Sequence, residues 1–240
     1  MEFNTYDLSL KDKVEDFTKQ LFYALFNDAC QKKEGDLKRQ FLDVLENLDI
    51  NKSQEIWMHY QTSFCDVRRQ LDLDAKVFEE RDPACKCIAE VYLAYPGFHA
   101  IAIYRLSHEL YKINVPILPR MMSEYGHSIT GVDIHPGATI GESFFIDHAT
   151  GVVIGETTVI KDNVSIYQGV TLGGIQVNKT LANTKRHPTI ESNVTIYANA
   201  TILGDIVVGP NSIIGANVCI TESITANSTV IYKSQNSIYN

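Results

Sequence analysis

Two short segments of this chain carry side chains suited to acid–base chemistry and ion binding. The first is Asp147-His148-Ala149-Thr150-Gly151, where a carboxylate and an imidazole precede three small residues. Histidine titrates near neutral pH, so His148 is a candidate general base. Asp133, 15 residues earlier, is a candidate partner, because a carboxylate on one imidazole nitrogen raises the basicity of the other. A turn residue that accepts backbone N–H groups explains Asp133 equally well.

The second segment, residues 173–188, begins with Gly173-Gly174 and ends with Arg186-His187-Pro188. Its basic residues stand out in an acidic chain. A guanidinium beside an imidazole suits a carboxylate, and cations suit phosphates such as those of coenzyme A. Paired glycines let the backbone approach a ligand closely. A solvated loop would show the same charges, since most charged loops face water.

Both segments interrupt a six-residue period, which indicates the element that must hold them. Aliphatic residues recur in three runs: Ile134, Ile140, Ile146; then Ile154, Ile160, Ile166, Leu172; then Ile190, Ile196, Ile202, Val208, Ile214, Ile220. A hexapeptide period predicts a parallel β-helix in which three units close a triangular coil. The thirteen units predict a little over four coils. The spacing of Asp133 and His148 is slightly less than one coil, so we expect them within hydrogen-bonding reach on adjacent coils.

Glycine and asparagine fall at the expected corners of the prism. The candidates are Gly137, Gly141, Gly155, Gly209, Gly215, Asn163, Asn193, Asn199, Asn211 and Asn217. Both residue types tolerate the left-handed backbone conformation that a tight corner requires. We therefore expect positive φ at these positions.

The first 120 residues show helical spacing of apolar residues instead. Helices are predicted around residues 14–25, 37–48, 57–71 and 98–113, with a last short helix through Met121 and Met122. Asp82-Pro83-Ala84 indicates a further helix start, with Asp82 as N-cap and Pro83 in the first turn. We expect an α+β protein: an α-helical domain at residues 1–130, a left-handed parallel β-helix at 131–225 and a tail at 226–240.

Composition excludes several classes of function. The 240 residues are 45% hydrophobic and 21% charged, with a net charge of −8, which argues against a nucleic-acid or anionic-membrane surface. No apolar run approaches the roughly 18 residues of a membrane span, and no signal peptide is visible. The five cysteines form no C-x-x-C motif, so free thiols in a cytoplasmic protein are expected. A short prism can bury one of its flat sides by associating with other copies of the chain, so a homotrimer is the first expectation.

Motifs from about residue 80 to 225 occur in an order that is specific. The helical part contains Arg81-Asp82-Pro83-Ala84, Tyr95-Pro96-Gly97-Phe98-His99-Ala100 and Tyr104-Arg105-Leu106-Ser107-His108. The prism contains Val132-Asp133-Ile134-His135-Pro136, Asp147-His148-Ala149-Thr150-Gly151, Gly155-Glu156-Thr157, Gln168-Gly169-Val170-Thr171-Leu172-Gly173-Gly174 and Arg186-His187-Pro188. Together they resemble the serine O-acetyltransferases of cysteine biosynthesis, whereas the six-residue period alone is shared with many acyltransferases.

The resemblance implies direct acetyl transfer from acetyl-CoA, a co-substrate, to L-serine, without a cofactor or metal. His148 would be the general base and Asp133 its orienting carboxylate. Serine would bind to Asp82, Asp147, Arg186 and His187, and L-cysteine would inhibit from the same subsite. Acetyl-CoA would contact Gly173, Gly174, Lys185, Ala198 and Ala216.

Three features depart from the family pattern. The segment between Gly174 and Arg186 is longer than the usual glycine-rich loop. The segment before residue 80, which builds a dimer-of-trimers contact in the family, matches poorly, so a homotrimer and a dimer of trimers are both expected. Many members end in an isoleucine that docks into a sulfhydrylase, whereas this chain ends in Asn240, so that complex is not expected.

Other functions stay open on the sequence. A hexapeptide acetyltransferase for a sugar or xenobiotic hydroxyl would keep a catalytic histidine but would not need Asp82 or the Arg186-His187 pair. A metal enzyme of the carbonic-anhydrase kind would need three histidines, such as His135, His148 and His187, to converge between subunits. If the prism were a non-catalytic scaffold, the break in the six-residue period at His148 would have no explanation.

Overall fold

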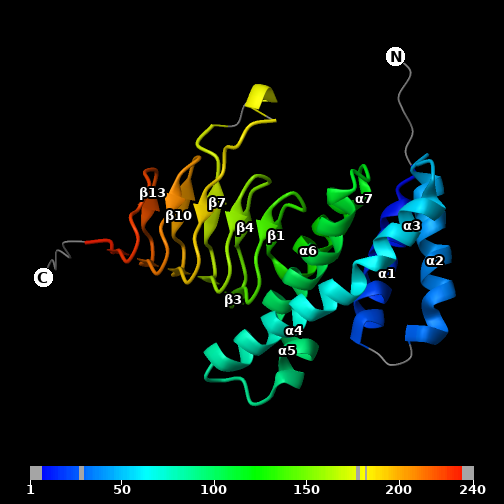
Figure 1. The fold of residues 1–240 in the computed structure, drawn as a ribbon, viewed down its shortest axis with the longest axis horizontal. Helices are drawn as coiled ribbons and strands as arrows, with labels where there is room; N and C mark the ends of the chain where they lie inside the picture. The colour runs from blue at the N-terminus through cyan, green and yellow to red at the C-terminus, as the bar shows by residue number, and fades with distance from the viewer. Residues whose placement is uncertain (1–6, 27–29, 177–178, 182, 234–240) are drawn as a thin grey trace, which may run out of the picture.

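Helices form the N-terminal half of the computed structural model and short strands form the rest, as predicted (Figure 1). The structure describes residues 7–26, 30–176, 179–181 and 183–233, so the terminal Asn240 lies outside the described residues. The helices are α1 (Ser9–Phe26), α2 (Cys30–Asn47), α3 (Ser53–Thr62), α4 (Phe64–Arg81), α5 (Ile88–Ala94), α6 (Pro96–Lys112) and α7 (Leu118–Thr130). The apolar faces of α1, α2 and α3 meet around Phe41, whose ring centroid lies 5.2–5.7 Å from those of Phe17, Trp57 and Tyr60.

Two local helix predictions are wrong. The helix expected over residues 57–71 is two helices, α3 and α4, which part at Ser63, where the backbone N–H and the hydroxyl both bind the Tyr60 carbonyl. Asp82 ends α4 and does not begin a helix. Its Oδ1 accepts the N–H of Ala84 at 2.8 Å, because an aspartate can cap its own turn as readily as a helix.

A left-handed parallel β-helix follows the helices, as the six-residue period predicts. Its strands are β1 (Asp133–Ile134), β2 (Thr139–Ile140), β3 (Phe145–Asp147), β4 (Val153–Ile154), β5 (Val159–Ile160), β6 (Ser165–Tyr167), β7 (Thr171–Gly173), β8 (Thr189–Ile190), β9 (Thr195–Ile196), β10 (Thr201–Leu203), β11 (Val207–Val208), β12 (Ile213–Ile214), β13 (Cys219–Ile220) and β14 (Thr229–Val230). They stack into sheet A (β1-β4-β7-β10-β13), sheet B (β2-β5-β8-β11) and sheet C (β3-β6-β9-β12-β14). Strand β14 lies beyond residue 225, so the stacked coils continue past the expected end of the prism.

The corners of the prism confirm the prediction for asparagine and contradict it for glycine. Asn163, Asn193, Asn199, Asn211 and Asn217 all have positive φ. Gly137, Gly141, Gly155, Gly209 and Gly215 do not. These corners need glycine because they leave no room for a side chain. A Cβ on Gly155 would lie 2.2 Å from the His187 ring, and one on Gly209 would lie 2.5 Å from the nitrogen of Ala226.

Helices α4 and α6 fasten the helical part to the first coil. Asp74 and Arg105 are buried and share two hydrogen bonds of 2.6 and 2.9 Å. Arg105 also donates to the Gly141 carbonyl at 2.7 Å, and Asp74 accepts the N–H of Phe144 at 2.9 Å. These bonds hold the α4 segment against the strand that ends at Asp147.

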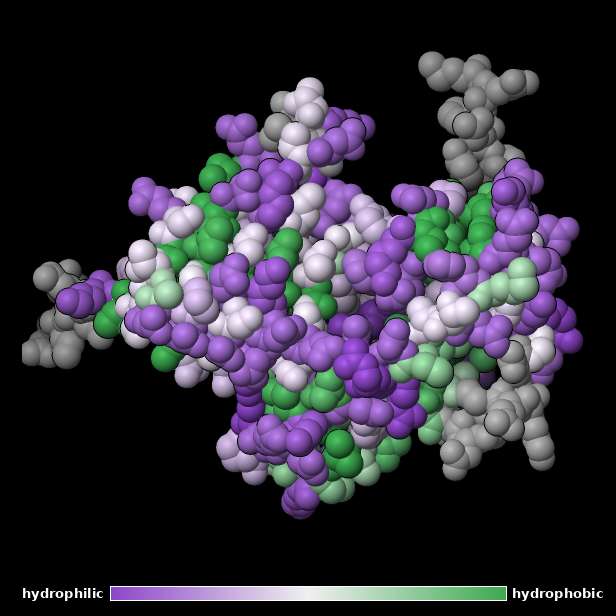
Figure 2. Space-filling view, in the orientation of Figure 1, coloured by the Kyte–Doolittle hydropathy of each residue, from purple (hydrophilic) through white to green (hydrophobic). Residues whose placement is uncertain are grey.

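The molecular surface is mainly hydrophilic on the face drawn in Figure 2, and hydrophobic residues form separate patches there. Across the described ranges, no helix is both long enough and apolar enough to cross a membrane. The loop after β7 projects away from the prism (Figure 1). Residues 177–178 and 182 of that loop lie outside the described residues.

Candidate active site

The first interruption of the period forms a tight corner between sheets C and A. His148 and Ala149 have φ values of 55° and 65°, and the N–H groups of Ala149 and Thr150 bind carbonyls two residues earlier at 2.6 and 2.7 Å. Two consecutive non-glycine residues in this region are strained, and such strain clusters at functional sites. The corner turns His148 outward, with 71% of its side chain exposed.

Asp147 contacts His148, whereas the predicted partner Asp133 does not. Asp147 Oδ1 accepts the backbone N–H of His148 at 2.9 Å, and its Oδ2 lies 3.7 Å from His148 Nε2. Asp133 Oδ1 instead lies 3.8 Å from the guanidinium of Arg120 on α7. No hydrogen bond or ion pair joins Asp133 to His148 in the described part of the chain, so the predicted dyad is not formed in this structure.

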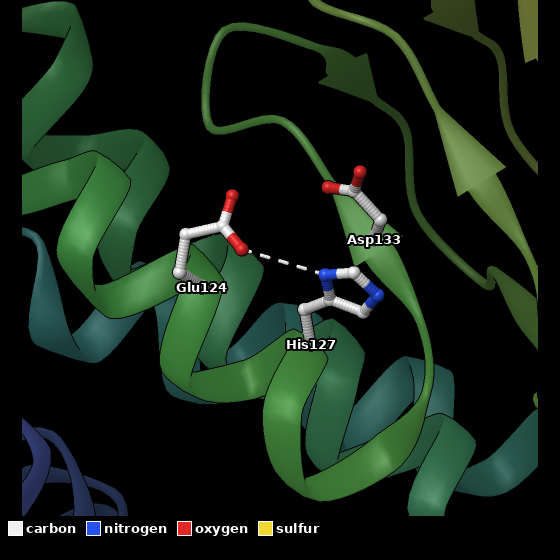
Figure 3. A group of neighbouring side chains, drawn as sticks. All are labelled: Glu124, His127 and Asp133. Atoms are coloured by element: carbon white, nitrogen blue, oxygen red, sulfur yellow. Dashed lines mark hydrogen bonds and ion pairs between the residues drawn. The ribbon is translucent and has the colours of Figure 1, made fainter.

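Asp133 belongs to a cluster with Glu124 and His127, drawn in Figure 3. The potential ligand atoms of the three lie within 4.8 Å of one another, and no other such group occurs among the residues described. Arg120 pairs with both Glu124 and Asp133. A guanidinium therefore already balances the charge that would attract a metal ion to this cluster.

The end of α4 brings Asp82 toward the corner of His148. The Tyr95 hydroxyl donates to Asp82 Oδ2 at 2.5 Å. The preceding residue, Arg81, donates to Ser165 on β6, and β6 pairs with β3 so that Tyr167 lies beside Asp147. Burial, then the charges of Asp147 and Asp82 among its neighbours, raises the pKa of the Tyr167 phenol. Two carboxylates near an exposed imidazole suit the ammonium group of an amino acid.

The second interruption closes a different corner, between sheets A and B. Its loop returns to the prism at Arg186, whose guanidinium donates to Glu156 Oε2. Glu156 Oε1 accepts the Tyr111 hydroxyl at 3.0 Å. Burial raises the pKa of Glu156, but the hydrogen bonds from Arg186 and Tyr111 outweigh it, and the net pKa is lowered. Glu156 therefore stays charged and orients Arg186, which is 23% exposed.

Thr157 sets the orientation and tautomer of His187. Its Oγ1 accepts the backbone N–H groups of Arg186 and His187 at 3.0 and 3.2 Å and lies 2.8 Å from His187 Nδ1. The Thr157 N–H also donates to Nδ1 at 3.1 Å, so the ring proton lies on Nε2. Burial, then the charges of Arg186 and Lys185, lowers the pKa of His187 to about 4. Near pH 7 the ring is neutral and offers Nε2–H as a donor.

The remaining predicted residues divide between the two corners. Ala198 and Ala216 follow β9 and β12, on the edge of the prism that also carries His148. Gly173 ends β7 beside the second corner. His135 lies at the second corner, where its Nδ1 accepts the N–H of Gly137 at 3.0 Å. Lys185 donates to the His187 carbonyl and lies 3.8 Å from Asp205, so it points along the prism in this structure.

Six residues that contribute to the two corners are missing from the sequence prediction: Arg81, Tyr95, Tyr111, Glu156, Thr157 and Tyr167. Arg81, Tyr95 and Thr157 stand inside the recognised motifs, but a motif does not show which neighbours hold its ligand-binding side chains. Tyr167 carries a usable signal: it stands 20 residues after Asp147, close to one coil plus the two-residue slip. That spacing places it beside Asp147.

One chain holds two half-sites. Sheet A forms the flat side of the prism between the two corners. This side is about five residues wide, so on the order of 15 Å separates His148 from Arg186. The three histidines His135, His148 and His187 therefore do not converge within one chain. The first corner offers carboxylates and an exposed imidazole, and the second offers a guanidinium and an imidazole donor. Together they complement a zwitterion that carries a hydroxyl.

Two family models match this chain. Residues 5–102 match the model "Serine acetyltransferase, N-terminal", and residues 187–222 match "Bacterial transferase hexapeptide (six repeats)". A serine acetyltransferase encoded on a plasmid of Synechococcus elongatus is 47% identical over 183 residues, 74% of this chain and 57% of the relative. The chain spans about half the length of the curated relatives it matches.

Solved structures match over more of their length. Serine acetyltransferase isoform 3 from Entamoeba histolytica, in complex with cysteine, is 33% identical with a TM-score of 0.83, covering 100% of this chain and 86% of that one. Serine acetyltransferase from Brucella abortus, in complex with coenzyme A, is 32% identical with a TM-score of 0.69, covering 90% of this chain and 78% of that one.

Proposed function

Since the chain belongs to the serine acetyltransferase family, we propose that it transfers the acetyl group of acetyl-CoA to the hydroxyl of L-serine, yielding O-acetylserine and CoA. This reaction would supply the activated serine for cysteine synthesis. The observation that carries the proposal is that carboxylates and an exposed imidazole lie at one corner of the prism, whereas a guanidinium and a neutral imidazole lie at another. A sugar acceptor would leave the second corner without a ligand.

The two corners complete one site only if another copy of the chain contributes. In a closed ring of three prisms with sheet A facing the axis, the first corner of each copy lies beside the second corner of the next. We therefore propose a homotrimer in which Asp82, Asp147 and His148 of one copy face Arg186 and His187 of its neighbour. Serine would bind with its ammonium on the carboxylates and its carboxylate on the guanidinium and the His187 Nε2–H.

His148 is the proposed general base. It would take the proton of the serine hydroxyl as Oγ attacks the thioester carbonyl, and the tetrahedral oxyanion would then expel the CoA sulfur. His148 would return the proton to that sulfur. Asp133 would orient the imidazole only after one of the two side chains moves, because no contact joins them here. The 71% exposure of His148 gives it room to do so.

Acetyl-CoA would lie along the edge of the prism that carries Ala198 and Ala216, with Gly173 and Gly174 of the neighbouring copy near the thioester. L-cysteine shares the ammonium and carboxylate of serine, so it would compete for the same subsite. The cysteine complex of the Entamoeba histolytica relative supports this part of the proposal.

Release of free thiol from acetyl-CoA, measured with and without L-serine, tests the function. We expect release that depends on serine and falls when L-cysteine is added, with competition between the two in steady-state kinetics. Sugars and xenobiotic alcohols at matched concentration provide the comparison. A sugar that outperforms serine would reject this proposal in favour of another acetyltransferase.

A further inference from the structure

A pair of stacked tyrosines lies on the outer face of sheet C. Ile166 on β6 and Ile196 on β9 point into the prism and are buried, so Tyr167 and Tyr197, one residue later, point outward. Their ring centroids are 5.1 Å apart with an interplanar angle of 22°. Tyr197 is 41% exposed, which leaves an aromatic surface uncovered in the single chain.

The pair continues a row that starts at the first corner. Asp147 pairs in register with Tyr167, and Tyr197 follows on the next coil. With strands about 4.8 Å apart, Tyr197 lies roughly 10 Å from Asp147 along the prism axis. Ala198 comes directly after Tyr197. The row therefore leads from the first corner toward Ala198 and Ala216, along the edge where acetyl-CoA is proposed to lie.

An open hollow of about 290 Å³ lies against the pair. Its lining combines the two rings with the polar side chains of Arg81, Asn163, Asn193 and Thr195. Arg81 and Asn193 are themselves bound to Asn163, which fixes the polar side of the hollow. A lining of aromatic faces beside amides suits a chain that alternates alkyl and amide groups.

We propose that the Tyr167–Tyr197 pair binds the pantetheine arm of acetyl-CoA and thereby sets the affinity for the acyl donor. This inference rests on the proposed function for the identity of the donor. The arm leaves the thioester at His148, runs along the prism axis and carries amide groups that can stack on aromatic rings. A purely structural stack would stabilise the sheet without affecting the donor.

The substitution Tyr197→Ala tests the pair. We expect the KM for acetyl-CoA to rise about three- to tenfold, because aromatic stacking and burial contribute on that scale, while kcat and the KM for serine change less than about twofold. Tyr197→Phe keeps the ring and should restore the KM. Tyr232→Ala is the matched control, because Tyr232 is 67% exposed and lies outside the hollow.

Two further measurements make the result decisive. With acetylpantetheine, which lacks the nucleotide, Tyr197→Ala should still raise the KM. If the KM for acetylpantetheine does not change, the rings contact the nucleotide of CoA, and the proposal is wrong. An unchanged KM, or a change in oligomer size by sedimentation that accounts for the effect, would overturn it as well.

Calorimetric titration with CoA separates this inference from the proposed function. If the native protein fails to acetylate serine but binds CoA with an affinity that Tyr197→Ala weakens, the proposed function falls and the tyrosine site stands. If the native protein binds no CoA, the tyrosine site falls too.

Discussion

The two corners of the prism interrupt the same six-residue repeat, but they differ in backbone strain and in the exposure of their histidine side chains. At the first corner the backbone is strained at His148 and Ala149, and the imidazole is exposed. At the second corner the backbone is relaxed at Gly155, and His187 is 9% exposed within a closed set of hydrogen bonds.

The difference separates the proposed general base from the pair that would bind the serine carboxylate. A general base must approach its proton and leave again, so an exposed ring on a rigid turn is suitable. A carboxylate-binding pair must hold its geometry before the ligand arrives, so Glu156 and Thr157 orient it in advance. Substitution of His148 at the first corner should therefore change turnover, and substitutions at the second corner should change serine affinity.

The largest expected effect is that of His148→Ala. General acid–base catalysis contributes about 10²–10⁴-fold, so kcat should fall at least about 100-fold. The side chain is 71% exposed, so the free energy of unfolding should change by less than about 0.5 kcal/mol. Steady-state kinetics and chemical denaturation check the two parts. A variant that keeps more than about a tenth of the native rate would remove His148 from the mechanism.

Thr157→Val should act on serine affinity. The backbone N–H of residue 157, which sets the His187 tautomer, is kept. The change removes the oxygen that accepts the backbone N–H groups of both Arg186 and His187 and contacts His187 Nδ1. Leaving such groups unpaired costs about 1–3 kcal/mol, so we expect the KM for serine to rise about tenfold or more with a smaller change in kcat.

The neighbouring Thr158→Val is the matched control for this substitution. Thr158 is buried, and its hydroxyl has no hydrogen-bond partner within the described residues. A methyl group there should be neutral or stabilising. Equal KM values for the two variants would show that Thr157 does not organise the second corner.

The sequence predicts the elements well because each depends on a local pattern of burial. The six-residue period identifies the β-helix, and asparagine marks its left-handed corners. Contacts between distant segments are harder to predict. Arg120, from a helix, competes for Asp133, and the His187 ring explains Gly155 by its bulk. Neither relation leaves a periodic signal in the chain.

The pH dependence of the free energy of unfolding tests whether the second corner holds the His187 ring in its neutral form. The pKa of His187 is about 4 in the folded protein, against 6.5 for the free group. Between these values the unfolded chain binds more protons, so the contribution of this group is present above pH 6.5 and is lost as the pH falls toward 4.

Denaturation of the native protein and His187→Gln across this pH range measures that contribution. The native protein should lose stability more steeply than the variant, because other titrating groups are common to both. Parallel curves would mean that the His187 ring is not held neutral by its surroundings.

Ala149→Gly should give the smallest effect, and its comparison with a control variant shows whether the first corner is strained. Positive φ costs a non-glycine residue about 1–2 kcal/mol, and glycine recovers it while losing about 0.5–1 kcal/mol of chain entropy. Ala149 is also buried, so glycine loses about 0.8 kcal/mol from the buried methyl group. The three contributions nearly cancel, and the free energy of unfolding should change by less than about 0.5 kcal/mol. Ala226→Gly is the control at an exposed corner residue without positive φ, where only the entropy loss applies and stability should fall. If Ala149→Gly is destabilising to the same degree, the first corner stores no strain, and the exposure of His148 has to come from its surroundings alone.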